Sequence, residues 1–317
     1  MKINYTYFTY TLVFIWSCLP GQSMAQEAAS DSINRYVLDP VVITGTRNEL
    51  QKSKIPSPVS VVSRADIENS NLTNVLPLLS YQVPGLFVNE RTITGFGVGP
   101  ESAGGISMRG LSTSGDPSNT RVLVLVDGQP QFMGVFGHPI SDAYLSSDIE
   151  RIEVIRGPAS VLYGTNAMGG AINLITRKKE KDGFNIGLNT AVGSFNTQQY
   201  NVHGGYKSGK LGIFAGGNYD KTESHRTDGT GDFYNKAGFL KIKYDLSDQI
   251  SLSADANYSE AEFLDPGTEA EPRLTNNWYQ FDRGRVAFSI DNAFSKVEGA
   301  LRFFYNFGEH RFSNNFF

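Results

Sequence analysis

Side chains that could carry out covalent or metal chemistry are scarce in this sequence. Cys18 is the one cysteine, and it lies in an N-terminal segment that we expect to be removed, which leaves the mature chain without a thiolate nucleophile or a disulfide. The glycine-rich stretch at 95–99 follows no clear strand and opens no helix, as a nucleotide-binding loop would. The four histidines lack the close spacing of a metal site; they are His138, His203, His225 and His310. We predict no catalytic residue, no metal site and no cofactor, and therefore no enzyme.

The composition is that of a folded protein rich in glycine. Of the 317 residues 33 are glycine, 40% are apolar and 19% are charged, which excludes disorder, collagen and coiled coil as descriptions of the whole chain. The net charge of −4 gives no reason to expect nucleic acid as a partner. A mean hydropathy of −0.27, without a second long apolar run, excludes a helical membrane protein. A β-barrel stays possible, because its alternating strands average to neutral hydropathy.

The first 25 residues have the pattern of a secretory signal peptide. Lys2 is followed by the mostly apolar run Tyr5–Leu19, and Ser23 and Ala25 are small residues at the −3 and −1 positions of a cleavage site. The apolar run is shorter than the roughly 20 residues of a transmembrane anchor. We predict removal of residues 1–25 and a polar, flexible lead at 26–38.

Residues 39–177 mix helix and strand patterns, as an α+β domain does. A capped helix is predicted over Ser63–Leu79, with Ser63 as N-cap and Asp66 three residues later. Pro77 predicts a break or a second short helix. Apolar runs predict three strands, which are Val122–Val126, closed by Asp127-Gly128, then Ile149–Ile155 and Ala171–Thr176.

From Phe184 onward, apolar and polar residues alternate in seven runs. The clearest are Phe184–Val192, Ile250–Tyr258 and Val297–Phe307, and weaker copies are Tyr200–Tyr206, Leu211–Tyr219, Phe233–Tyr244 and Val286–Ile290. Alternation over about ten residues is typical of transmembrane barrel strands, apolar toward lipid and polar toward the lumen. A soluble sandwich would alternate too, but in strands of about 5–6 residues, so strand length favours the membrane barrel.

The connections between these runs alternate in length. Short turns at 207–210, 245–248 and 292–296 follow the second, fourth and sixth runs, whereas long polar loops at 221–232 and 259–277 follow the third and fifth. Outer-membrane barrels have short periplasmic turns and longer outer loops. We therefore predict that the first strand rises from the periplasm.

Five motifs resemble those of TonB-dependent outer-membrane receptors of the siderophore and vitamin B12 type, and they follow one another along the chain in the same order as in those receptors. DIERIEVIRGPASVLYGTNAMGGAINLIT at 148–176 is similar to the hallmark of the receptor plug domain, and VPGLFV (83–88), ISMRG (106–110) and VLVLVDGQP (122–130) are similar to other plug motifs. DPVVITGTR at 39–47 resembles the TonB box. The resemblance implies a signal peptide (1–25), a lead with the TonB box (26–47), an α+β plug domain (48–177), and antiparallel transmembrane β-barrel strands (178–317).

The implied TonB box is a segment that TonB would capture by adding it to a sheet edge. Three consecutive β-branched residues provide the strand propensity, and the polar lead provides slack. In isolation such a run could be an ordinary strand, but its position and its company favour the TonB box. Its residues are Asp39, Pro40, Val41, Val42, Ile43 and Thr44.

The resemblance also implies roles for plug side chains. Arg109 and Arg156 resemble positions that meet carboxylates on the barrel wall; the alternative is that they cap the turns before Gly110 and Gly157. The loops 89–105 and 129–144 correspond to loops that reach the bound ligand, although packing against the wall is an alternative for their side chains. The candidate ligand contacts are Arg91, Phe96, Phe132, Met133, Phe136 and His138.

The implied function is uptake of a siderophore-iron, haem or cobalamin-like chelate across the outer membrane. The implied partners are TonB with its inner-membrane energising complex, the chelate, and outer-membrane lipid. The lead at 26–38 is too short for the signalling domain of transducing receptors or the extension of glycan importers. A passive porin would need neither plug nor TonB box, whereas a plugged-barrel adhesin or a carbohydrate importer of the same superfamily stays an alternative.

Seven strands are too few to surround such a plug. Plugged transporters of this family resemble 22-stranded barrels. A plug of about 130 residues is roughly 36 Å across, whereas seven tilted strands ~4.8 Å apart would close into a tube only about 14 Å wide. We therefore expect an incomplete barrel and a chain that is the N-terminal portion of a receptor.

Overall fold

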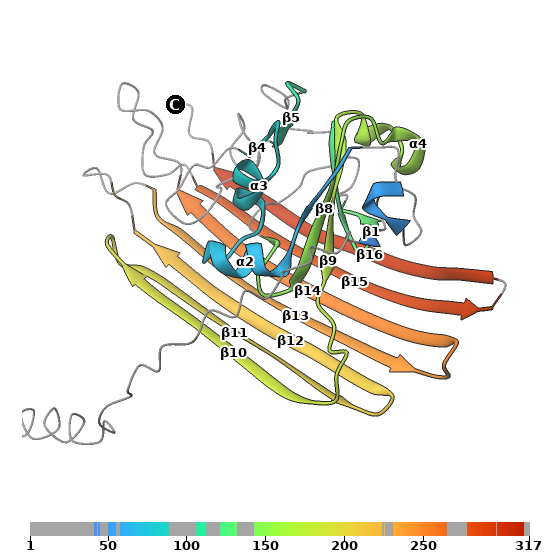
Figure 1. The fold of residues 1–317 in the computed structure, drawn as a ribbon. Coiled ribbons are helices and arrows are strands. Elements are labelled where there is room, and N and C mark those ends of the chain that lie inside the picture. Colours follow the sequence, from blue (N-terminus) through green and yellow to red (C-terminus); the bar gives the residue numbers. More distant parts are fainter. Residues whose placement is uncertain are drawn as a thin grey trace, which may run out of the picture. The chain divides into compact units, whose positions relative to one another are not determined.

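A computed structural model gives the arrangement of the chain (Figure 1). It describes residues 41–42, 44, 50–54, 58–88, 106–111, 121–131, 143–223, 225, 231–264, 278–295 and 297–313. All of them belong to one compact unit that spans residues 39–317. Within these described ranges, no helix is long and apolar enough to cross a membrane.

The first part of this unit is an α+β domain built on a five-stranded sheet. The strand order is β3-β8-β9-β6-β7, and only the β6–β9 pair is parallel. All five side chains of β6 are buried, which confirms a strand covered on both faces. The five strands are β3 (Val59–Val62), β6 (Val122–Val126), β7 (Gln129–Pro130), β8 (Ile149–Arg156) and β9 (Gly170–Thr176).

Smaller elements complete this domain. Two short antiparallel pairs are formed by β1 (Val41–Val42) with β2 (Leu50–Gln51), and by β4 (Leu86–Val88) with β5 (Ile106–Met108). The remaining helical elements are α4 (Ser160–Tyr163) and the 3₁₀ turns η1 (Lys52–Lys54) and η3 (Thr165–Ala167).

The predicted helix from Ser63 is two helices, α2 (Arg64–Ser70) and α3 (Leu76–Gln82). Ser63 and Asp66 form the expected capping box at the start of α2. The break comes at Asn71, which ends α2 in the left-handed conformation with φ 54°, and Pro77 lies in the first turn of α3. The leucines of α3 pack into the apolar core of the domain.

The second part is an antiparallel sheet of seven strands in chain order, with β10 at one edge and β16 at the other (Figure 1). The sheet is not closed: among the described residues β10 pairs only with β11, and β16 only with β15. The prediction of seven strands is confirmed. They are β10 (Gly183–Gly193), β11 (Thr197–Ser208), β12 (Leu211–Thr222), β13 (Phe233–Asp245), β14 (Ile250–Leu264), β15 (Trp278–Phe294) and β16 (Val297–Ser313).

Several strands are longer than their apolar alternation predicts. The run Val286–Ile290 is part of the 17-residue strand β15, and β16 continues to Ser313, beyond the predicted run that ends at Phe307. Backbone pairing continues to Trp278↔Ser313 although both faces carry polar side chains there, for example the adjacent residues Asp282 and Arg283. A pattern of apolar residues cannot report a strand whose two faces are both polar.

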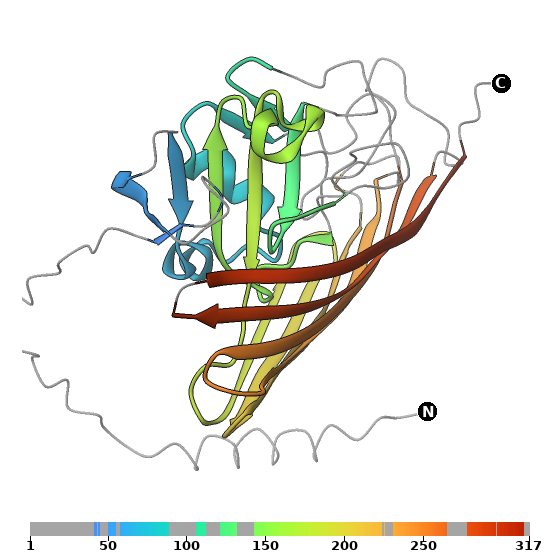
Figure 2. The same ribbon diagram turned by 90° about the vertical axis from the view of Figure 1, so that its right-hand side faces the viewer.

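The two faces of the seven-stranded sheet differ as barrel strands require. On one face the apolar side chains are exposed, as Phe184, Ile186 and Leu188 are on β10, at 68–70%. The other face carries polar and charged residues that contact the α+β domain. Figure 2 shows the curvature of the sheet, with the α+β domain against its concave side.

Candidate functional site

Thr44 fixes the N-terminal segment to the α+β domain. Its backbone N and its Oγ1 both donate to Oε2 of Glu153, at 2.8 and 2.6 Å. Its carbonyl oxygen accepts from the hydroxyl of Tyr163 at 2.9 Å. Neither Thr44 nor Val42 has exposed surface, and Val42 packs into an apolar cluster of the domain. The described residues 42 and 44 are therefore bound to the domain in this structure.

Glu153 is a fully buried carboxylate at the middle of β8, paired across the sheet with Asn173 of β9. Arg151, two residues earlier and on the same side of the strand, donates to Oε1 of Glu153 at 2.8 Å. Asn173 donates through Nδ2 to Oγ1 of Thr44 at 2.9 Å. A buried carboxylate is stable only with such partners, so Thr44 is part of what satisfies this site.

The turn after β6 joins the α+β domain to the seven-stranded sheet. Asp127 and Gly128 have φ of 49° and 78°, as both central residues of a type I′ turn do. Asp127 forms an ion pair with Lys241 of β13 at 2.8 Å and accepts from N and Oγ1 of Thr176 at 2.9 and 2.6 Å. Lys241 also donates to Oγ1 of Thr176. The turn is thereby anchored on the sheet.

The residues that follow this turn continue the contact along β15 and β16. Gln129 accepts through Oε1 from Arg285 at 3.2 Å, and the carbonyl of Gln131 accepts from Arg283 at 3.1 Å. Asn306 of β16 donates to the carbonyl of Pro130 at 2.9 Å. The guanidinium of Arg285, which is 2% exposed, is also ion-paired with Asp255 of β14 at 2.8 Å. The buried Arg285 is therefore paired with a carboxylate, whereas Nη1 of the buried Arg283 has no hydrogen-bond partner among the described residues.

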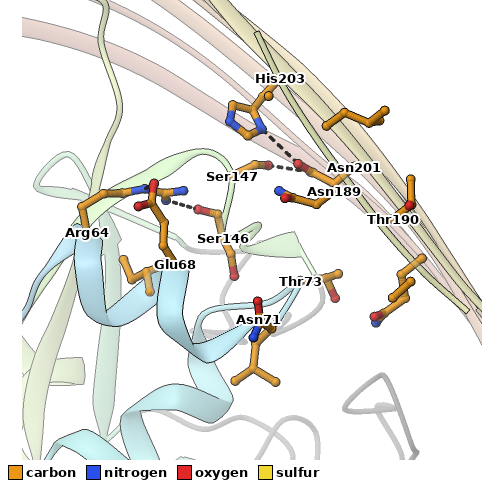
Figure 3. Close-up of a pocket in the computed structure, with 16 residues that line it drawn as sticks. Arg64, Glu68, Asn71, Thr73, Ser146, Ser147, Asn189, Thr190, Asn201 and His203 are labelled. Atoms are coloured by element: carbon orange, nitrogen blue, oxygen red, sulfur yellow. Dashed lines mark hydrogen bonds and ion pairs between the residues drawn. The ribbon is translucent and has the colours of Figure 1, made fainter. Parts of the chain in front are cut away.

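A cavity of about 690 Å³ lies between α2, the segment at 146–147, and strands β10 and β11 (Figure 3). Ser147 accepts from Asn201 at 2.9 Å, and Asn201 in turn lies 3.0 Å from Nδ1 of His203. The ion pair of Arg64 with Glu68, at 2.8 Å, supplies the charges of the lining. The remaining polar lining is amide and hydroxyl groups, which suit water or neutral hydroxylated groups.

The pKa values of two carboxyl groups of the α+β domain, Asp127 and Asp148, are shifted in opposite directions. Burial opposes ionisation of Asp127, yet Lys241, Arg285 and the hydroxyl of Thr176 hold its pKa well below its usual range. Burial raises the pKa of Asp148 to about 7, helped by the charge of Asp127 and opposed by Lys241. Asp127 is therefore charged at neutral pH, whereas Asp148 titrates near it.

Aromatic side chains gather on the concave face at one end of the sheet, where β13 and β15 begin and β14 ends. The rings of Phe263 and Tyr279 are stacked at 5.4 Å, and the rings of Phe281 and His310 meet edge-on at 4.7 Å. Phe263, Tyr279 and Phe281 form a buried apolar cluster with Phe233. These strand ends adjoin the long loops that we predict to lie outside the membrane.

Comparison with known proteins identifies the α+β domain. Residues 51–171 match the family model described as the TonB-dependent Receptor Plug Domain. Residues 51–171 therefore form a TonB-dependent receptor plug domain, and the chain as a whole shares the fold of solved receptor structures in which a plug is followed by barrel strands.

Three such structures illustrate the likeness. The pyoverdine outer membrane receptor FpvA from Pseudomonas aeruginosa PAO1 is 17% identical with a TM-score of 0.65, and the match covers 85% of this chain and 40% of that one. The siderophore receptor PiuA from Acinetobacter baumannii is 15% identical, with a TM-score of 0.63 and 81% and 37% coverage. The ferric yersiniabactin uptake receptor FyuA from Yersinia pestis is 19% identical, with a TM-score of 0.61 and 75% and 39% coverage. This chain therefore spans less than half the length of each receptor.

The structure places only some of the predicted site residues. In the TonB-box prediction, Val41, Val42 and Thr44 are described. All six predicted ligand contacts, and three residues of the predicted TonB box, lie outside the described residues. These are Arg91, Phe96, Phe132, Met133, Phe136 and His138, and Asp39, Pro40 and Ile43.

The two motif arginines lie at one end of the plug. Arg109 begins a type I′ turn with Gly110, with φ of 51° and 79°, and a Cβ added at Gly157 would meet its Nη1 at 3.5 Å. Arg156 is half-buried at the end of β8, and its Nε has no hydrogen-bond partner among the described residues. Neither arginine is ion-paired with a described residue of β10–β16, so their contact with wall carboxylates stays a prediction.

The residues that do join the plug to the wall were missed by sequence reasoning. Lys241 and Arg285 lie on the inward face of strands in which apolar and polar residues alternate. A long charged side chain at such an inward position could have indicated a contact with the plug. Asp127 was identified only as part of a turn. Among the described residues, no three His, Cys, Asp or Glu side chains are grouped so as to hold a metal ion.

Proposed function

We propose that the protein serves TonB-dependent uptake of an iron–siderophore complex across the outer membrane. The observation that supports this most is the attachment of the plug to the inner face of the barrel strands, at Asp127–Lys241 and along residues 129–131. A plug fixed in this way obstructs a passive route. A large solute can pass only when these contacts are broken, and breaking buried polar contacts requires free energy.

The ligand class is proposed from the kind of receptor that shares this fold. The solved structures described above are named as receptors for pyoverdine, yersiniabactin and other siderophores. We extend that class to this chain and keep the six loop residues Arg91, Phe96, Phe132, Met133, Phe136 and His138 as its proposed contacts. Haem and cobalamin-like chelates, surface adhesion and carbohydrate import are alternative outcomes of the test.

Residues 39–44 are proposed as the TonB box. Val42 and Thr44 are buried against the plug, so TonB could add this segment to its own sheet only after the segment has left the plug. We further propose that residues 1–25 are removed on export and that the exposed apolar face of β10–β16 contacts outer-membrane lipid.

The test is uptake of radiolabelled iron by cells that express the complete gene product. Ferric siderophores of different chelating chemistry, haem and cobalamin are offered separately to cells with and without TonB. We expect accumulation of at least one ferric siderophore only when TonB is present, and surface binding of the same chelate in both strains. Accumulation of haem or cobalamin alone would change the ligand class, and binding of none would contradict a transport function.

A further inference from the structure

Asn173 contacts both the N-terminal segment and the turn that anchors the plug. Its Nδ2 donates to Oγ1 of Thr44, and its Oδ1 accepts from the backbone N of Gly128, each at 2.9 Å. Asn173 lies on β9, between β8 and β6 in the plug sheet. One side-chain amide with 1% exposure thus holds two segments of the chain at once.

On the N-terminal side, Glu153 holds Thr44 in place, and Thr44 supplies hydrogen-bond donors to the buried Glu153. Thr44 gives two hydrogen bonds to Oε2 of this fully buried carboxylate. If Thr44 leaves, Oε2 loses these two donors while Arg151 stays on Oε1, and the loss is costly for a buried carboxylate. Release of the segment is therefore opposed by a specific site and not only by apolar packing.

On the wall side, Gly128 and Asp127 are the two central residues of one tight turn. The position of Gly128 is set by Asn173, and Asp127 of the same turn reaches Lys241 and Thr176. Since a type I′ turn is a compact unit with two fixed left-handed residues, a shift at Gly128 also shifts the carboxylate of Asp127. Hydrogen bonds from Thr44 to Gly128, the peptide bond between Gly128 and Asp127, and the ion pair of Asp127 with Lys241 therefore connect Thr44 to β13.

We propose that Thr44, Glu153 and Asn173 form a latch that couples residues 39–44 to the Asp127–Lys241 anchor on the barrel wall. Breaking the contacts of Thr44 should weaken the Asp127–Lys241 ion pair, and breaking that ion pair should favour release of Thr44, because coupling between two sites is reciprocal. The inference rests on the proposed function only in naming residues 39–44 as the segment on which TonB acts.

The test measures whether Val42 becomes accessible. Cys18 is the only cysteine in the 317 residues, so V42C is made with Cys18→Ser where the leader is retained, and with serine in place of every cysteine encoded beyond residue 317, to give a single reactive thiol. Its maleimide labelling rate is measured on outer membranes that contain the complete gene product, from cells without TonB and without added siderophore. Labelling should be slow in this parent, and Thr44→Val or Glu153→Gln should speed it at least about tenfold. Heat-modifiability shows that each variant has assembled, and Glu153→Gln decides if Thr44→Val does not assemble.

The wall side is tested with Lys241→Met and a matched control. Lys241→Met should speed V42C labelling by about fivefold or more. Asn306→Ala removes another plug–wall hydrogen bond, to Pro130, and should leave the rate within about twofold of the parent. A parental rate in Glu153→Gln or in Lys241→Met, or equal acceleration by Asn306→Ala, would overturn the latch. Because neither TonB nor siderophore is present, a receptor that transports nothing yet gives the expected rates retains the latch and loses only the proposed function.

Discussion

Asp127 of the plug and Lys241 of the barrel strand β13 are 114 residues apart in the chain and 2.8 Å apart in the structure. Their side chains are 22% and 13% exposed, so this ion pair is mostly removed from water. Thr176 contacts both partners and fills the remaining hydrogen-bonding positions of the carboxylate. The pair therefore joins the plug sheet to the wall at a defined point.

Removing the cation should weaken this junction. Lys241→Met leaves the Asp127 carboxylate charged and partly buried, and we expect the free energy of plug unfolding to fall by about 1–3 kcal/mol, less than for a fully buried pair. Hydrogen exchange of β6 and β9 measures this. Asp127→Asn added to Lys241→Met should restore part of the loss, because asparagine tolerates the left-handed backbone of this turn. No change in Lys241→Met would contradict the role given to the pair.

The stability of the plug should fall as the pH rises from about 5 to 8. Burial raises the pKa of Asp148 to about 7, so between its ordinary value near 4 and pH 7 the folded plug holds a proton that the unfolded chain has released. Stability from this group is complete below pH 4 and is lost as the pH passes through 7. Thermal unfolding between pH 5 and 8 tests this, and Asp148→Asn should flatten the curve. The same slope in wild type and Asp148→Asn would assign the dependence to another group.

Asp127 should act in the opposite direction at acid pH. Its pKa is held below the ordinary range, so it contributes stability above about pH 4 that is lost as the pH falls further. We expect Asp127→Asn to remove the loss of plug stability seen below pH 4 and, because the charge of Asp127 helps to raise the pKa of Asp148, to move the decline between pH 5 and 8 to lower pH. An unaltered acid limb in this variant would contradict the assignment.

The two faces of β14 should differ in their tolerance of charge. Ala254 is exposed on the apolar face, and its neighbour Ser253 lies on the concave face. Ala254→Arg should destabilise the inserted barrel by about 2–4 kcal/mol, whereas Ser253→Arg should have a smaller effect. Heat-modifiability in urea compares the two variants. Equal effects would mean that the apolar face does not meet lipid.

The parts of the fold that could be predicted from sequence are those with a local signal. The apolar run Val122–Val126 predicts burial on both faces, and the alternation in Phe184–Val192 predicts one apolar face; in each case the pattern lies within one strand. The capping box at Ser63 is equally local. The outer half of β15 was missed because polar residues occupy both of its faces, for example Gln280 and Arg283.

The candidate site was less predictable because its contacts are not local. Nothing within the sequence around Asp127 indicates Lys241 as its partner, and Thr44 lies 109 residues from Glu153. Polar partners across such distances leave no periodic pattern. Motifs indicated which segments matter, such as 39–47 and 148–176, but not which side chains within them meet.

The account is tested most directly by Val42→Pro in the complete gene product. Proline removes a backbone donor and fixes φ, which an added edge strand tolerates poorly, so TonB should no longer capture this segment. Val42→Ile, which keeps the strand propensity and the apolar side chain, is the matched control. Binding and uptake of a labelled ferric siderophore are measured in the same cells. We predict that Val42→Pro binds the chelate at the cell surface like wild type but accumulates none, whereas Val42→Ile does both. Uptake at the wild-type rate in Val42→Pro would contradict transport driven through residues 39–44.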